Sequence, residues 1–129
     1  MEITDFEQFK KTGAKLSSNT ISINRALSFG FNSGFYHKNN LKDYKLVVLF
    51  YNEKNHSVGF FFTNNEAEGK LKITHSESKT SGGVTARSFF TNYKLDSDIA
   101  TLAGKYKPQE VTHPVFGKIF IIELDKKLN

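Results

Sequence analysis

The sequence predicts a mainly β protein of the α+β class, a compact barrel-like or interlocked-hairpin unit built from two related halves with short helices. Apolar and polar residues alternate over several short segments, which is the two-residue period of strands. The longest apolar runs, Leu46–Tyr51 and Ile119–Ile122, have the length of strands and fall far below the ~20 residues of a membrane span. The chain has 129 residues and no Cys, so we expect a single domain whose core needs no disulfides.

The N-terminal segment, residues 1–17, is predicted to form an amphipathic helix or arm. Ile3, Phe6 and Phe9 are spaced as on one helix face, and Gly13 ends the pattern. We expect the two phenylalanines to pack on the domain.

The first half, residues 18–63, is predicted to contain strands, one short helix and a hairpin. Phe35 and Tyr36 anchor the helix, and Ser33 is its expected N-cap. The elements expected in order are a strand over 18–24, an extended piece over 26–31, a helix over 34–40, a turn at 42–43, a long strand over 44–51 and its returning partner over 58–63.

The second half, residues 69–124, follows an acidic turn over 64–69. Its loop over 76–83 has no large apolar residue, which favours a mobile loop. Its elements in order are a strand over 70–75, that loop, a short strand over 84–86, a helix over 87–93, a partly strand-like segment over 99–106, a loop over 107–117 with both prolines, and a final strand over 118–124 before a frayed tail.

The two helical segments are similar to each other. The nine residues from Ser33 and the nine from Arg87, 54 positions later, each carry two adjacent aromatic residues and a Leu six positions after the first ring. A helix of one or two turns buries little area, so large rings are needed to anchor it. We interpret the match as a sign of internal duplication.

Arg25 follows the first expected strand, Ser28 and Phe29 precede the helix, and the turn Leu41–Tyr44 comes after it. With these residues, the order of elements in each half resembles the swapped-hairpin family of AbrB-like transition-state regulators and antitoxins, and two copies in one chain resemble its MraZ-like form. The family's Gly and Pro before the helix and its Gly-Asp pair in the turn are absent here. The resemblance implies an interlocked sheet that binds double-stranded DNA as a dimer or pseudo-dimer.

Positive charge concentrates in corresponding parts of the two halves. The whole chain carries +5, while residues 24–45 carry +3 and residues 69–94 carry +4. Such a distribution favours a polyanionic partner, most of all DNA, with lysines on phosphates and asparagines on base edges. The candidate nucleic-acid-binding residues are Asn24, Arg25, Lys38, Asn39, Lys42, Lys45, Lys70, Lys72, Lys79, Arg87 and Lys94. The alternative is a solvated, lysine-rich surface without a ligand.

The leading hypothesis is therefore a non-enzymatic DNA-binding protein that acts as a small regulator of transcription or a chromatin-like factor. A second hypothesis is a protein–protein interaction module, an inhibitor or assembly factor, that uses the loops 76–83 and 107–117 and an edge strand. A third is a single-strand binder that stacks bases on exposed rings, with Phe60–Phe62 and several tyrosines as candidates. Homo-oligomers are compatible with each hypothesis.

The sequence offers few groups for catalysis or metal binding. The histidines His37, His56, His75 and His113 form no close pair, and there is no thiol and no phosphate-binding loop. We expect no enzymatic activity, no metal and no cofactor. The first residues lack the apolar stretch of a secretory signal, so we expect a cytoplasmic protein without a membrane segment.

Overall fold

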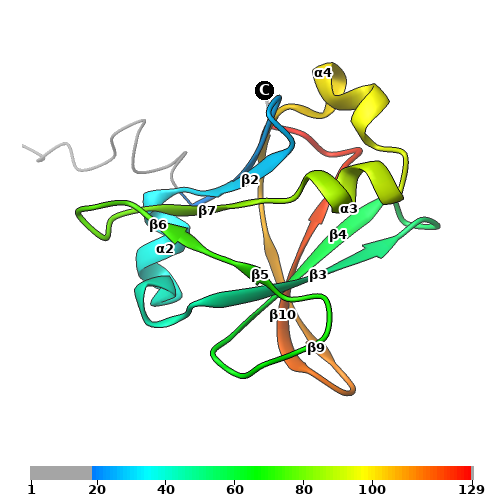
Figure 1. Ribbon diagram of the computed structural model, residues 1–129. Coiled ribbons are helices and arrows are strands. Elements are labelled where there is room, and N and C mark those ends of the chain that lie inside the picture. The colour runs from blue at the N-terminus through cyan, green and yellow to red at the C-terminus, as the bar shows by residue number, and fades with distance from the viewer. Residues whose placement is uncertain (1–18, 129) are drawn as a thin grey trace, which may run out of the picture.

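The computed structural model describes residues 19–128, so the predicted arm over residues 1–17 lies outside the described residues. The described part is mainly β, with a few short helices (Figure 1). The strands are β1 (Ile21–Asn24), β2 (Ser28–Phe31), β3 (Leu46–Asn52), β4 (Ser57–Thr63), β5 (Leu71–Lys72), β6 (Thr74–His75), β7 (Gly82–Thr85), β8 (Gly104–Tyr106), β9 (Gln109–His113) and β10 (Gly117–Glu123). The helices are α2 (Ser33–Lys38), α3 (Arg87–Asn92) and α4 (Ile99–Leu102), with 3-10 turns η2 (Leu41–Asp43) and η3 (Asp96–Asp98).

The strands form two antiparallel sheets, with the orders β6-β7-β2-β1-β8 and β5-β3-β4-β10-β9. The sheets do not close into a barrel, so the barrel-like form of the prediction is wrong. The reason is that, among the described residues, no strand of one sheet pairs with a strand of the other, although two chain segments contribute a strand to each sheet. Residues 71–75 supply β5 to one sheet and β6 to the other, and residues 104–113 supply β8 and β9 in the same way. In Figure 1, α2 and α3 lie at opposite ends of the β2–β7 pair.

The core between the sheets is built from phenylalanine. Phe60 on β4 is fully buried, and its ring meets those of Phe29 and Phe31 edge to face at 5.0 and 5.9 Å between centroids. Phe62 points to the same side as Phe60, whereas Phe61 points to the other face and contacts Phe116. This alternation confirms the strand period expected for the three consecutive rings.

The two short helices predicted from the sequence are present as α2 and α3. Each buries its pair of aromatic residues, and the leucines that follow, Leu41 and Leu95, are buried too. The expected cap is wrong, because Ser33 is the first helical residue and Asn32 occupies the N-cap. The Asn32 side chain instead donates to Thr20 Oγ1 and Ser22 Oγ, at 2.6 and 2.9 Å, and ties the helix to β1.

The strand expected over 70–75 is divided into β5 and β6, and three further expected segments differ from the structure. Residues 99–106 divide into α4 and β8, with Ala103 between them, and β8 begins at Gly104, whose φ is +151°. The expected loop 107–117 contains β9, because its prolines flank the strand rather than interrupt it. The expected loop 76–83 ends early, since Gly82 and Gly83 belong to β7. A Cβ at Gly83 would lie 2.8 Å from Phe29 O, so β2 and β7 approach closely only with glycine there.

Candidate nucleic-acid interface

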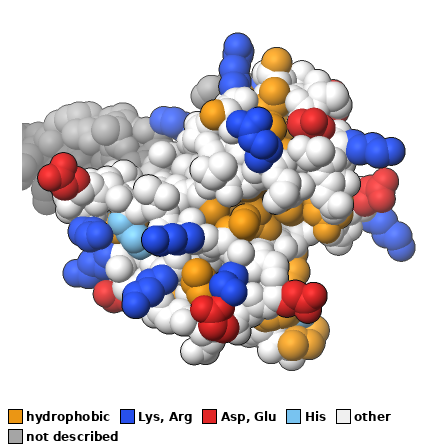
Figure 2. Space-filling view, viewed as in Figure 1, with side chains coloured by type: hydrophobic (Ala, Val, Ile, Leu, Met, Phe, Trp, Pro, Cys, Tyr) orange, Lys and Arg blue, Asp and Glu red, His pale blue; other side chains and the backbone are white. Residues whose placement is uncertain are grey.

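A concave surface of about 820 Å³ lies where the start of β3 meets the segment 71–75. We call it the basic concavity, and its lining residues are Lys45, Leu46, Asn64, Glu66, Lys70, Lys72, Ile73 and His75. Figure 2 shows Lys and Arg side chains gathered around a histidine on the side of the molecule where α2 and β6 lie.

Strand pairing creates this surface from two distant parts of the chain. Leu46 on β3 lies opposite Lys72 on β5, and Ile73 N–H donates to Lys45 O at 2.9 Å. Lys45 comes from the first cationic stretch and Lys72 from the second. Ile73 is buried while Lys72 is exposed, so the alternation of the strand turns its lysines outward.

Asn64 fixes the backbone at one end of the basic concavity. Its Oδ1 accepts from Lys45 N at 2.8 Å, and its Nδ2 donates to Asp43 O at 2.8 Å. Both ends of the amide are therefore engaged, and the residue joins the end of β4 to the start of β3. Asn64 is a positioning residue for the Lys45 backbone.

His75 is held by two hydrogen bonds that span the fold. Its Nε2 lies 2.8 Å from Tyr44 O and its Nδ1 lies 2.7 Å from Tyr36 Oη. A carbonyl oxygen only accepts, so Nε2 carries a proton, and in the Nε2–H tautomer the Tyr36 hydroxyl donates to Nδ1. Burial, with a smaller contribution from the Asp43 carboxylate, raises the pKa of Tyr36, so its hydroxyl stays protonated.

The charge of the basic concavity is positive. Three ammonium groups face one carboxylate, that of Glu66, which pairs with Lys70. Among the described residues, Lys45 and Lys72 have no ion pair. Exposed pairs such as Lys70–Glu66 contribute only ~0–1 kcal/mol, so an anionic ligand competes readily for this lysine.

The other predicted site residues lie elsewhere. Ala86 N–H donates to Leu27 O at 3.0 Å, which brings the turn that carries Arg25 against the start of α3, where Arg87 lies. Lys38 and Asn39 line a separate hollow beside Glu110. Residues that are exposed and do not line the basic concavity are Asn24, Lys42, Lys79 and Lys94.

Two of the predicted base-reading amides are already engaged. Asn39 Nδ2 donates to Phe35 O at 3.0 Å, and Asn24 Nδ2 donates to Ser28 Oγ at 3.1 Å. The sequence also missed His75 as a member of the site. Its partner Tyr36 is 39 residues away, and no spacing in the sequence indicates that contact.

Within residues 19–128, no group of three or more His, Cys, Asp or Glu side chains is placed to hold a metal ion. No helix in that same range is both long and apolar enough to cross a bilayer. Comparison with protein-family models, curated proteins and solved structures gave no match to this chain.

Proposed function

We propose that this chain binds nucleic acid without enzymatic action, and double-stranded DNA in preference, through the basic concavity. One observation carries the proposal: the register of β3 against β5 places lysines of both cationic stretches, Lys45 and Lys72, on one concave surface. Lys70 and His75 extend the same surface.

Phosphate attraction is the physical basis of the proposal. Each lysine that neutralises a phosphate releases counterions, and log K falls with log salt concentration by ~0.9 per contact on a duplex. Three lysines correspond to a slope of about −2.7. Such a short contact set supports moderate, salt-sensitive binding, as expected for a small regulator or chromatin-like factor.

The lining favours a duplex over a single strand. Single-strand binders stack bases on aromatic rings, and within residues 19–128 no Phe or Tyr lines the basic concavity. The one amide there, on Asn64, is committed to backbone groups at both ends. Contacts to phosphates therefore dominate over base reading, and we expect little dependence on DNA sequence.

We also propose that the fold arose by internal duplication, in keeping with the resemblance to swapped-hairpin proteins. The orders β6-β7-β2-β1 and β3-β4-β10-β9 each have two strand pairs, one on either side of a central antiparallel contact, β7 with β2 and β4 with β10, as a duplication would produce. In one pair, residues 28–31 lie against residues 82–85, at the same offset as the two helices. The other central pair, β4 with β10, joins strands of equal length.

The test is the anisotropy of a labelled DNA duplex over a salt series. In the variant Lys45→Gln/Lys72→Gln we expect about tenfold weaker binding at low salt and a slope shallower by about 2. The matched control Lys54→Gln/Lys107→Gln removes the same charge from exposed positions outside the basic concavity and should bind within twofold of the parent. Absent binding at low salt, a salt-independent signal, or equal losses in both variants contradicts the proposal.

A competition experiment distinguishes duplex binding from single-strand binding. An unlabelled duplex should displace the labelled duplex at lower concentration than a single strand of the same length. The opposite order would favour the single-strand hypothesis over the duplex.

A further inference from the structure

The edge of β3 is only partly covered. On the side away from β4, β5 pairs with Leu46 and Val47 alone. The chain leaves the line of β5 at Gly69, whose φ of +77° is a conformation that favours glycine. Beyond Val47, no strand in the described part of the chain lies on this side of β3. The edge from Val48 to Asn52 is therefore open.

Backbone polar groups face this open edge. Ile73 N–H donates to Lys45 O at 2.9 Å, so the odd-numbered residues of β3 direct their backbone groups towards β5. The same alternation continues at Leu49 and Tyr51, and no backbone group of the described residues pairs with them on that side. The N–H and C=O groups of both residues form a template for one more strand.

The usual protection of a sheet edge is absent from β3. Its sequence, as the strand is described, is Leu-Val-Val-Leu-Phe-Tyr-Asn, without a charged residue or a proline. Charged side chains, prolines and bulges are the common devices that prevent an edge strand from pairing with another chain. An apolar edge of this kind accepts an added strand unless something covers it.

A groove of about 320 Å³ lies beside the open edge. Figure 2 shows hydrophobic side chains gathered between α3 and the β3–β5 edge. Tyr93 on α3 is 42% exposed, and its ring lies 4.7 Å from that of Tyr51 and 5.1 Å from that of Phe89 between centroids. The described lining is uncharged and shares no residue with the basic concavity. It consists of Leu49, Gly69, Leu71, Ser88, Phe89, Asn92 and Tyr93.

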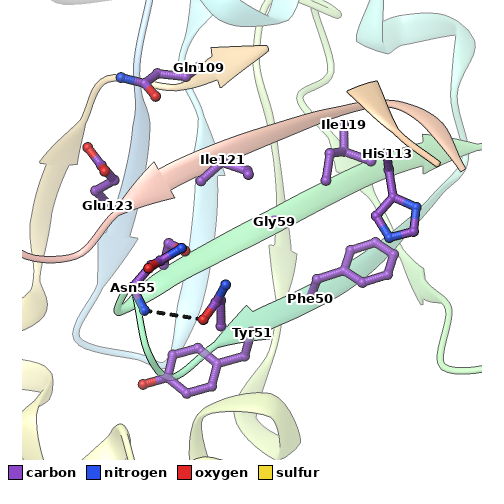
Figure 3. Close-up of a pocket in the computed structure, with 11 residues that line it drawn as sticks. Phe50, Tyr51, Asn55, Gly59, Gln109, His113, Ile119, Ile121 and Glu123 are labelled. Atoms are coloured by element: carbon purple, nitrogen blue, oxygen red, sulfur yellow. Dashed lines mark hydrogen bonds between the residues drawn. The ribbon is translucent and has the colours of Figure 1, made fainter. Parts of the chain in front are cut away.

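The side chains of an added strand would have two environments. Figure 3 shows that Phe50 and Tyr51 extend from opposite faces of β3. Leu49 and Tyr51 pack against the core on the side of α3, whereas Phe50 contacts Phe116 on the outer face. Residues directly opposite each other in antiparallel strands share a face. The residues of an added strand opposite Leu49 and Tyr51 would therefore enter the groove, and the residue between them would lie on the outer face.

One end of the open edge is acidic. Glu53 follows β3 directly, is exposed, and forms no ion pair with another described residue. After burial, the carboxylates of Glu53 and Asp125 contribute to the raised pKa of Tyr51, which indicates that both lie near this end. Asp125 is paired with His56 at 2.7 Å, so Glu53 is the carboxylate available to a cation.

We propose that an extended segment of another protein binds here as an added strand, antiparallel to β3 and in the line of β5. Its apolar side chains lie opposite Leu49 and Tyr51, and a basic residue lies next to Glu53. The open backbone groups select an extended chain over a helix or a small molecule. The uncharged groove selects the apolar side chains, and Glu53 selects the basic end. This inference does not depend on DNA binding, because the two surfaces are separate.

The probe is the peptide Lys-Thr-Val-Thr-Phe-Thr, carrying a dye without net charge, and anisotropy measures its binding. Its Val and Phe are spaced to lie opposite Tyr51 and Leu49. In this register the N–H groups of Val and Phe point towards β3, and the N–H group of the Thr between them points to solvent. N-methylation at Val should weaken binding about tenfold, because a backbone donor is lost, whereas N-methylation at that Thr should leave binding within about twofold.

Protein variants with matched controls test the side-chain contacts. Tyr93→Ala removes a ring from the groove and should weaken binding several-fold, whereas Val115→Ala truncates an exposed apolar side chain outside the groove and should not. Glu53→Gln should weaken the peptide about threefold and leave a peptide with Gln in place of Lys unchanged. The control Glu110→Gln removes an exposed carboxylate of β9, at the opposite edge of the sheet, and should change neither. Circular dichroism checks the fold of each variant.

The proposal is overturned if the peptide does not bind at millimolar protein concentration, or if N-methylation at the central Thr weakens binding as much as N-methylation at Val. A dimer of this chain that excludes the peptide would assign the edge to a second copy and would also overturn it; sedimentation velocity over a range of concentrations detects such a dimer. Because the N-methyl groups are placed in the peptide, that comparison decides the proposal even where a protein variant fails to fold.

Discussion

The hydroxyl of Tyr106 should make the stability of this protein depend on alkaline pH. Tyr106 is 1% exposed, and its hydroxyl donates to Leu102 O at 2.6 Å. Burial, with a smaller contribution from the Asp125 carboxylate, raises the pKa of Tyr106 to about 12, against an ordinary value of 10.0. The folded protein therefore retains a proton that the unfolded chain loses between these values.

The direction and the size of the pH effect on the free energy of unfolding follow from this difference in pKa. A raised pKa means that the stabilisation is complete below pH ~10 and is lost as the pH rises towards about 12. At ~1.4 kcal/mol per pH unit, the loss approaches about 3 kcal/mol. The variant Tyr106→Phe lacks the hydroxyl and loses its hydrogen bond at every pH, at a cost of about 1 kcal/mol. The two stability curves should cross near pH ~11.

Urea unfolding at intervals from pH 8 to 12, followed by far-ultraviolet circular dichroism, measures both curves. Other tyrosines titrate in both proteins, so their contribution cancels in the difference between parent and variant. If the difference in the free energy of unfolding between parent and variant is the same from pH 8 to 12, burial does not raise the pKa of Tyr106 and the reasoning is refuted. A variant that is as stable as the parent at pH 8 would show that the bond to Leu102 O adds nothing.

Three further predictions test the packing and the site. Phe60→Ala should lower the free energy of unfolding by about 3–5 kcal/mol, and Phe61→Ala by less than half of that, since only Phe60 faces the core; urea unfolding would expose any reversal of this order. Gly83→Ala should cost more than ~2 kcal/mol because its Cβ would meet backbone, whereas Gly30→Ala, directly opposite, should cost under ~1 kcal/mol; equal melting temperatures would contradict the close approach of the strands. Asn64→Ala should weaken DNA binding several-fold with an unchanged salt slope; a reduced slope would mean that the amide itself contacts phosphate.

Local structure could be predicted where one sequence pattern dominated. The alternation around Ile21 and Ile23 indicated a strand, and paired rings indicated both helices. The pattern failed where two elements share a short stretch. Residues 99–106 carry one helical turn and then a strand, and neither is long enough to set a period. Pro108 and Pro114 predict a loop, because proline interrupts strand pairing. The residue type does not indicate whether a strand lies before or after it, and here β9 lies between the two prolines.

The candidate site could be predicted only in part, because it depends on contacts between distant residues. The sequence identified Lys45 and Lys72 as members of cationic stretches, but their proximity comes from the register between β3 and β5. The contact of His75 with Tyr36 depends on the same arrangement.

The basic concavity needs both halves of the chain. Lys45, directly before β3, comes from the residues before the acidic turn, and the segment 71–75 supplies Lys72 and His75 from the residues after it. That segment belongs to both sheets, because β5 pairs with β3 and β6 pairs with β7. Lys45 and Lys72 lie on neighbouring strands of one sheet, whereas His75 on β6 belongs to the other, so any change that separates the two sheets must pull His75 away from the lysines. DNA affinity and global unfolding should be lost together as denaturant rises, and affinity lost well before unfolding would place the ligand on another surface.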